Sequence, residues 1–143
     1  MKRLRFKELS RSYFKQGRAR YQTAKLAYNQ YNYPYCVRQA QESVELTLKG
    51  ALRLVGVEYP KSHDVSEALL SNLNRFPERF RKSIGEAARI SKELARKRAA
   101  AMYGEEASNL PPEKIFDRND AKKAIDDARQ VLETCKKLLR PLS

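Results

Sequence analysis

The stretch Ala40-Gln-Glu-Ser-Val-Glu-Leu-Thr-Leu-Lys-Gly-Ala-Leu52 decides the fold of this chain. It lies within a longer pattern, about residues 34–55, in which apolar residues recur every three or four positions, as on one face of an α-helix. Further leucines lie on the other sides, and a helix that is apolar over much of its circumference is usually packed by several neighbours. We therefore predict a central helix, whose few polar residues, chiefly Glu42, Glu45 and Lys49, are candidates for function.

Length and composition limit the class of protein. The 143 residues suffice for one domain with a substantial core, so we predict a single domain over residues 1–143. The chain has no Trp, five Gly and six Pro, and its composition favours an all-α fold. We find no pattern typical of a signal peptide or a membrane span, and we therefore expect a cytoplasmic protein that does not contact a membrane.

The cysteines and the histidine give little support for metal or redox chemistry. Cys36 and Cys135 stand far apart in helical patterns, and we expect reduced thiols. With one His and no Cys-x-x-Cys pattern, we expect no metal site and no cofactor. The only histidine, His63, lies beside possible helix caps at Ser62 and Asp64, and we expect it to hold a loop rather than to catalyse a reaction.

The positive charge is concentrated in two segments. The formal net charge is +13; residues 1–25 carry nine Lys or Arg and one acid, and residues 75–98 carry nine and three. A field of this sign attracts polyanions, most obviously nucleic acid. The alternative is that these basic faces only keep a small dimer in solution.

Periodicity predicts an all-α helical bundle of about five helices. We expect helices at about residues 6–31, 34–55, 65–73, 77–102 and from 119 or 120 to Pro141, with Gly56 and Gly104 ending two of them. The short connection around Pro34 predicts that the first two helices form a long antiparallel hairpin, on which the bundle is built.

The first helix should pack through one arc and expose a basic arc. The inward arc is predicted to contain Leu9, Tyr13, Gly17, Tyr21, Ala24, Tyr28 and Tyr31. Arg20 projects into this arc, and it either extends to solvent or reaches an acid on the second helix.

The whole chain resembles the HEPN domain family. The resemblance rests on motifs in a fixed order, which are Tyr31-Asn-Tyr-Pro-Tyr35, the stretch 40–52, Ser62-His-Asp-Val65, Ala100-Ala-Met-Tyr-Gly-Glu-Glu106 and Asp120-Ala-Lys-Lys-Ala124. It implies a small helical bundle with a long antiparallel pair at its centre. Family members include metal-independent ribonucleases and toxins, and also noncatalytic nucleic-acid or nucleotide binders that often work beside a minimal nucleotidyltransferase.

The ribonuclease members carry an arginine, four to six residues, and a histidine on the last long helix. No register from Arg96 or Arg98 gives a histidine here. In a toxin variant of the motif, counted from Arg96, Tyr103 matches a tyrosine and Ala101 replaces the histidine. A tyrosine, with a pKa near ~10, is a poor general base at neutral pH. We therefore expect no catalytic residue here, and a phosphate-binding role for Arg96, Arg98 and Tyr103.

Family members also use an acid and a lysine one turn apart on the second helix. Glu45 and Lys49 match that spacing, and the alternative is an ordinary i,i+4 pair. The resemblance thus predicts a noncatalytic, homodimeric module for RNA or nucleotide phosphates, partnered by a nucleotidyltransferase or belonging to a toxin–antitoxin type system. Two alternatives stay open: a metal-independent ribonuclease with a displaced or degenerate active site, and a purely protein-interaction subunit.

Overall fold

The computed structural model describes residues 2–139, with side chains from residue 5 onward. Its five α-helices are α1 (Lys2–Asn29), α2 (Tyr33–Leu54), α3 (Ser66–Ser71), α4 (Arg81–Tyr103) and α5 (Arg118–Leu139). Within these residues there is no β-strand, and one isolated bridge joins Glu105 to Leu110. The predicted all-α bundle of about five helices is therefore confirmed.

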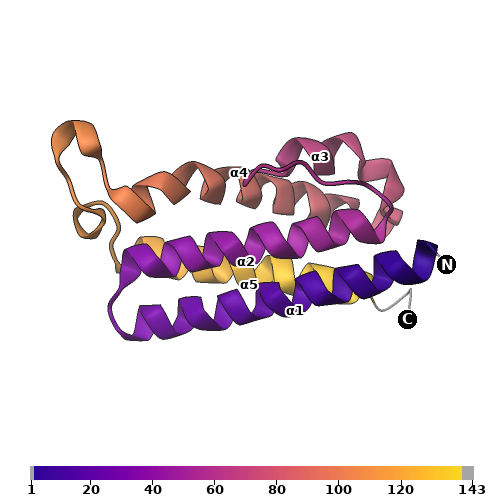
Figure 1. Ribbon diagram of the computed structural model, residues 1–143, viewed down its shortest axis with the longest axis horizontal. Helices are drawn as coiled ribbons and strands as arrows, with labels where there is room; N and C mark the ends of the chain where they lie inside the picture. Colours follow the sequence, from indigo (N-terminus) through magenta and orange to yellow (C-terminus); the bar gives the residue numbers. More distant parts are fainter. Residues whose placement is uncertain (1, 140–143) are drawn as a thin grey trace.

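Helices α1 and α2 form the predicted antiparallel hairpin (Figure 1). Two reciprocal hydrogen bonds fix its register: Ser10 Oγ donates to the Gly50 carbonyl at 2.7 Å, and Ser43 Oγ donates to the Gly17 carbonyl at 2.7 Å. A Cβ on Gly17 would overlap the Thr47 hydroxyl. The small residues therefore let the two backbones approach closely.

Helix α2 is the central helix, as predicted. It packs against α1, α4 and α5, and Figure 1 shows it between α1 and α4. Its fully buried residues include Val37, Ala40, Val44, Leu48 and Leu52. Because three helices cover it, its polar side chains can reach solvent only along a narrow strip.

The core face of α1 differs from the predicted arc. Its buried residues are Ser10, Phe14, Gly17, Ala24 and Ala27. The predicted tyrosines within the helix are half-buried at the rim of this face, where a phenol keeps its hydroxyl near water. The predicted inward placement of Tyr31 is wrong, because this residue is 79% exposed.

Several helix boundaries also differ from the predictions, and α3 ends at Ser71 rather than near residue 73. Helix α1 extends from Lys2 to Asn29 rather than over 6–31, because residues 2–5 are good helix formers and Tyr31 has a positive φ of 62°. Helix α4 begins at Arg81, after a 3₁₀ turn at Glu78–Phe80, instead of at Pro77.

Helix α5 begins at Arg118, earlier than Asn119 or Asp120. The backbone N–H of Asp120 donates to Asp117 Oδ1 at 3.0 Å, and that of Asp117 donates to Asp120 Oδ2 at 2.9 Å. This reciprocal pair is a capping box, so Asp117 caps the helix. Pro141, predicted to end it, lies outside the described residues. Gly56 and Gly104, with φ values of 79° and 73°, follow α2 and α4 as predicted.

Candidate functional site

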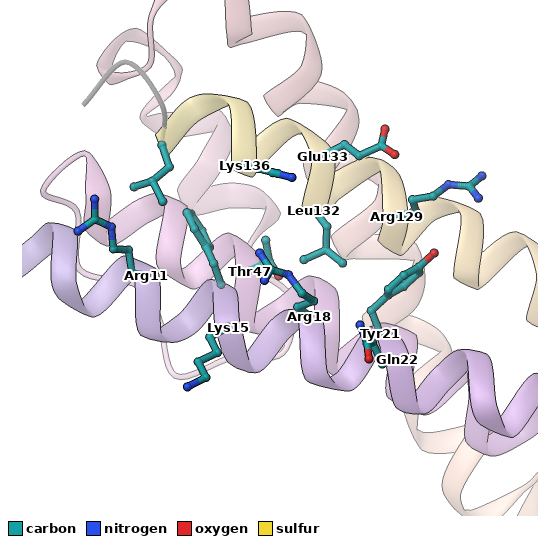
Figure 2. Close-up of a pocket in the computed structure, with 12 residues that line it drawn as sticks. Arg11, Lys15, Arg18, Tyr21, Gln22, Thr47, Arg129, Leu132, Glu133 and Lys136 are labelled. Carbon is teal, nitrogen blue, oxygen red and sulfur yellow. The ribbon is translucent and has the colours of Figure 1, made fainter. Parts of the chain in front are cut away.

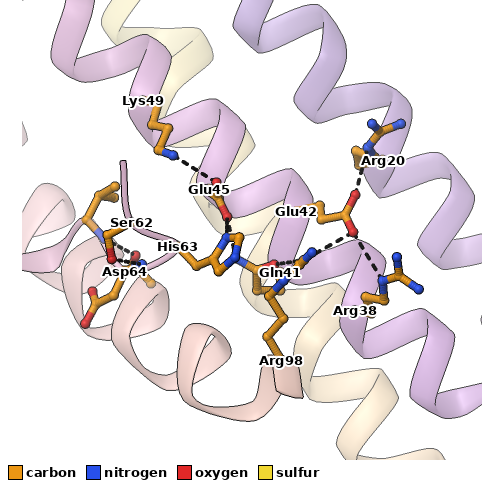
Figure 3. Close-up of polar contacts among 12 residues, drawn as sticks. Arg20, Arg38, Gln41, Glu42, Glu45, Lys49, Ser62, His63, Asp64 and Arg98 are labelled. Carbon is orange, nitrogen blue, oxygen red and sulfur yellow. Dashed lines mark hydrogen bonds and ion pairs between the residues drawn. The ribbon is translucent and has the colours of Figure 1, made fainter. Parts of the chain in front are cut away.

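Three arginines from three helices converge on the carboxylate of Glu42 on α2. Arg20 Nε of α1 lies 3.1 Å from Oε1; Arg38 Nε of α2 and Arg98 Nη1 of α4 lie 3.4 and 3.2 Å from Oε2. Figure 3 shows these side chains approaching Glu42 from different directions. Of the two readings of Arg20, the contact with an acid on the second helix is the one that the structure shows.

This arginine cluster (Arg20, Arg38, Arg98 and Glu42) has more positive charge and more donors than its carboxylate can use. One negative charge faces three positive ones, and each guanidinium carries five N–H groups. The Nε atom of Arg38 is buried and forms no hydrogen bond, although it lies in ion-pair range of Glu42. The side chains are partly exposed, from 19% for Arg98 to 44% for Arg20. The cluster can therefore accept a further anion.

A second group of contacts surrounds Glu45, about one turn along α2. Its carboxylate accepts hydrogen bonds from Gln41 Nε2 and Lys49 Nζ, both at 2.9 Å, and lies 2.7 Å from His63 Nδ1. Burial raises the pKa of the Glu45 carboxyl, but the hydrogen bonds from Gln41, Lys49 and His63 lower it more, and the net pKa lies below its usual value. Glu45 is therefore a carboxylate at neutral pH.

The ionised Glu45 determines the tautomer of His63. A carboxylate oxygen 2.7 Å from Nδ1 requires that this nitrogen carry the proton, which leaves Nε2 of the neutral ring as an acceptor. The loop that carries the ring is held by two bonds, from Asp64 N to Ser62 Oγ at 3.2 Å and from Ser66 N to Asp64 Oδ1 at 2.9 Å. His63 thus holds a loop, as predicted, but its side chain is also 57% exposed and oriented by an acid.

Gln41 joins the two groups. Its Oε1 accepts a hydrogen bond from Arg98 Nη1 at 2.6 Å, while its Nε2 donates to Glu45. The amide is almost fully buried, at 1% exposure, so its orientation is fixed by these two partners. The structure therefore brings together four of the residues singled out from the sequence, Glu42, Glu45, Lys49 and Arg98.

Arg96 and Tyr103 lie on another side of α4. They are seven residues apart and so share one side of the helix, whereas Arg98 is turned about 200° from Arg96, toward α2. Both are exposed, Tyr103 by 65%. Within one chain, the predicted group of Arg96, Arg98 and Tyr103 is thus divided between two surfaces.

The sequence interpretation did not assign site roles to Arg38, Gln41 and His63. Helical spacing alone predicts a polar strip on α2, because polar residues recur there every three or four positions. They are Arg38, Glu42, Glu45 and Lys49. The contacts of Gln41 with Arg98 and of Glu45 with His63 join elements far apart in the chain, and no local pattern predicts them.

The described residues contain no group of three or more His, Cys, Asp or Glu side chains that could hold a metal ion. Cys36 and Cys135 are free and buried. Burial raises the pKa of each thiol to about 12, so both stay protonated and unreactive at neutral pH.

The fold and this strip define a class: a small α-helical bundle with a cluster of arginines around an acid of its central helix. The family model for the HEPN domain matches residues 10–138, and the chain belongs to this family. Family membership associates the chain with nucleotide- and RNA-related modules in general.

Among solved structures, the chain is similar to the crystal structure of TT1696 from Thermus thermophilus. The TM-score is 0.71 at 20% sequence identity, over 90% of this chain and 96% of that one, which shows a shared fold. No curated protein matches the chain. Among the described residues, no helix is long and apolar enough to cross a membrane.

Proposed function

We propose that the chain is a noncatalytic HEPN module that binds RNA or nucleotide phosphates through the arginine cluster around Glu42. The observation that carries the proposal is the sharing of one carboxylate by three guanidinium groups. A phosphate oxygen can occupy the donors that Glu42 leaves free, and arginine forks match phosphate geometry. The proposal includes a location in the cytoplasm, where RNA and nucleotides are present.

Charge supports the same proposal. The strip along α2 brings four cations, Arg20, Arg38, Arg98 and Lys49, beside two carboxylates. The whole chain has a formal net charge of +13, and this positive field raises the concentration of a polyanion near the protein. Glu42 and Glu45 hold the cations in place, so little side-chain entropy is lost when a phosphate binds.

Binding is tested by fluorescence anisotropy with a labelled single-stranded RNA. We expect affinity to fall steeply between about 50 and about 200 mM salt, because binding releases counterions. Arg20→Ala and Arg38→Ala should weaken binding, while Lys92→Ala, which removes an exposed cation of α4, should not. Affinity that is flat across this salt range, or equal losses in all three variants, would show that the cluster does not bind RNA.

Homodimerisation is part of the proposal. Arg96 and Tyr103 of both chains would enlarge the surface that binds phosphate groups. Tyr103 and Leu110, exposed by 65% and 40%, support an interface at the end of the bundle that carries the connection 104–117 (Figure 1). Light scattering should give about twice the chain mass of 16.6 kDa. A monomer mass at every concentration would disprove the proposed dimer, but it would leave the proposed role of the arginine cluster unaffected.

We also propose a minimal nucleotidyltransferase as partner, as in a toxin–antitoxin type system. Co-purification of the two proteins from one expression host tests this interaction. If the protein forms a stable complex with the nucleotidyltransferase but binds no RNA, the result would instead favour a purely protein-interaction subunit.

A second candidate, metal-independent cleavage of RNA, is favoured by the contact of His63 with Glu45. Nε2 of neutral His63 would take the proton of a ribose 2′-hydroxyl. The 2′-oxygen then bonds to phosphorus, the P–O5′ bond breaks, and the 5′-oxygen takes a proton from a water molecule, which regains one from His63. Arg98, joined to Glu45 through Gln41, would stabilise the charge on the phosphorane oxygens.

Cleavage is tested by incubating RNA with the purified protein in EDTA. If this candidate holds, His63→Gln and Arg98→Ala abolish cleavage, Lys92→Ala leaves it intact, and the product ends in a 2′,3′-cyclic phosphate. No cleavage, or cleavage that persists in His63→Gln, would leave the noncatalytic function.

A further inference from the structure

A groove opens between α1 and α5, and it shares no residue with the arginine cluster. Figure 2 shows Tyr21 and Leu132 facing the space between the two helices. The volume of the groove is about 690 Å³, and α3 and α4 contribute no residue to its lining. The lining covers residues 11–22 of α1 and 129–139 of α5, so each side is about 15 Å long at the helical rise of about 1.5 Å per residue. The groove is therefore as long as about three turns of an α-helix.

The lining repeats every seven residues on both helices. A cation stands at the first position of each repeat, and an apolar residue follows three positions later. The four cations are Arg11, Arg18, Arg129 and Lys136, and the four apolar residues are Phe14, Tyr21, Leu132 and Leu139. Seven residues are close to two helical turns, so each helix presents a row of apolar side chains with a row of cations beside it. Any groove between two helices is lined at this spacing, but here the kind of residue is also the same at each position.

The apolar rows are only partly covered by the chain itself. Phe14 is buried, whereas Tyr21, Leu132 and Leu139 are half-buried. Apolar side chains at seven-residue spacing on two helices leave holes, which the side chains of a third helix fill. A helix laid along the groove would therefore cover these rows, as α2 covers another side of α1 and α5.

The charges at the two edges determine what such a helix must carry. Arg129 forms an ion pair with Asp126 at 3.1 Å, and Glu133 is the one acid of the lining. The cations of the lining without an acidic partner among the described residues are Arg11, Lys15, Arg18 and Lys136. Unpaired cations on both edges favour acidic residues on both flanks of the bound helix. A second copy of this chain does not meet that requirement, because its formal net charge is +13.

We propose that this groove binds an amphipathic helix of a partner protein, apolar on one face and acidic on both flanks of that face. The apolar residues of the partner helix, spaced three, four and seven positions apart, would pack against Tyr21, Leu132 and Leu139. Its Glu and Asp side chains would pair with the cations at the edges. A nucleic-acid backbone would use the cations alone and leave the apolar rows exposed, so the apolar rows favour a helix as the occupant. The inference does not rest on the function proposed for the arginine cluster.

The groove is tested by fluorescence anisotropy with a labelled synthetic peptide as the probe. The peptide has about 14 residues, with Leu at heptad positions a and d, Glu at e and g, and Ala elsewhere. A scrambled peptide of the same composition keeps the charge but loses the apolar face. We expect the amphipathic peptide to bind at least about tenfold more tightly than the scrambled one, because only the first can cover the apolar rows.

Substitutions separate the apolar contribution from that of charge. Leu132→Asp should weaken binding at least about tenfold, because a carboxylate would then lie under the bound helix without a partner. Leu132→Ala, a milder change for the fold, should weaken binding at least about threefold. Lys136→Glu should also weaken it at least about threefold, because an attraction is replaced by a repulsion.

Two control variants complete the experiment, and circular dichroism checks that every variant is folded. Lys92→Glu on α4 makes the same change in net charge as Lys136→Glu, but at an exposed position away from the groove. Arg38→Ala alters the arginine cluster. Both should bind the amphipathic peptide like the wild type.

Three results would overturn the inference. The first is that the amphipathic peptide does not bind, and the second is that Lys136→Glu and Lys92→Glu lose affinity equally. The third is equal affinity for the amphipathic and scrambled peptides, which would make the groove a general polyanion surface. None of these results changes the RNA titrations of Arg20→Ala and Arg38→Ala, so failure of this site and failure of the proposed function can be told apart.

Discussion

Replacing Glu42 with glutamine should weaken the fold and strengthen RNA binding in the same protein. The substitution keeps the size of the side chain and removes the one negative charge shared by Arg20, Arg38 and Arg98. Three partly exposed guanidinium groups are then left close together. Exposed ion pairs contribute about 0.2–1 kcal/mol each, and loss of a buried partner costs about 3–5 kcal/mol. For this half-buried site we expect a loss of about 1–3 kcal/mol in the free energy of unfolding.

The gain in affinity follows from Coulomb's law. A phosphate bound to the arginines would lie about 7 Å from the Glu42 carboxylate, and removing that repulsion is worth about 0.6 kcal/mol at a dielectric constant of about 80 and about 2.4 kcal/mol at about 20. RNA should therefore bind about threefold to fiftyfold more tightly, since about 1.4 kcal/mol corresponds to a factor of ten.

The two effects are measured on the same sample, by urea unfolding and by anisotropy of a labelled RNA. Glu86→Gln is the matched control, because it makes the same change in net charge at an exposed ion pair of α4, with Arg89. It should change affinity little. Unchanged or reduced RNA affinity in Glu42→Gln, in a protein that is still folded, would show that the three arginines do not contact phosphate.

Three further predictions concern stability. Leu48→Ala, at a position with no solvent exposure, should lower the free energy of unfolding by about 2–5 kcal/mol in urea titrations, and a loss below about 1 kcal/mol would show that α2 is not central. Gly17→Ala should cost about 1–3 kcal/mol by the same measurement, because the added methyl group overlaps the Thr47 hydroxyl; a neutral effect would contradict the close approach of α1 and α2. Burial raises the pKa of Glu93, but hydrogen bonds from Lys97 and Lys123 outweigh it and lower the pKa to about 2. Stability from this group is therefore full above its usual pKa of about 4.5 and is lost as pH falls toward 2, and Glu93→Gln should flatten that part of the pH profile of wild-type unfolding.

The sequence was sufficient to predict the helices and their central pair. Apolar spacing identified α2, and the short connection at Pro34 predicted the hairpin, since both depend on local geometry. The inner face of α1 was harder to predict, because tyrosines and small residues alternate around it. The helix faces the core with Ser10, Gly17 and Ala24, because small residues allow the backbones to approach closely. A hydrophobicity pattern counts a tyrosine as an inward residue, whereas the fold keeps its hydroxyl at the rim.

The candidate site could be predicted only where its contacts follow from one helix. Glu45 and Lys49 are one turn apart, and their pairing follows from spacing. The bond between Arg98 and Gln41 spans 57 positions in sequence, and it depends on how far α4 is displaced along α2. The family motif placed Arg96 and Arg98 in one predicted group, although residues two apart on a helix point in nearly opposite directions.

The central position of α2 explains why the candidate site gathers there. A helix covered by α1, α4 and α5 leaves only a strip of polar side chains near water, so several of them find a partner on a neighbouring element. Glu42 takes arginines from α1 and α4, and Glu45 takes a histidine from the loop before α3. The same contacts that satisfy α2 therefore hold these charges at fixed positions beside one another. A phosphate that binds there meets groups already oriented by the packing of the bundle.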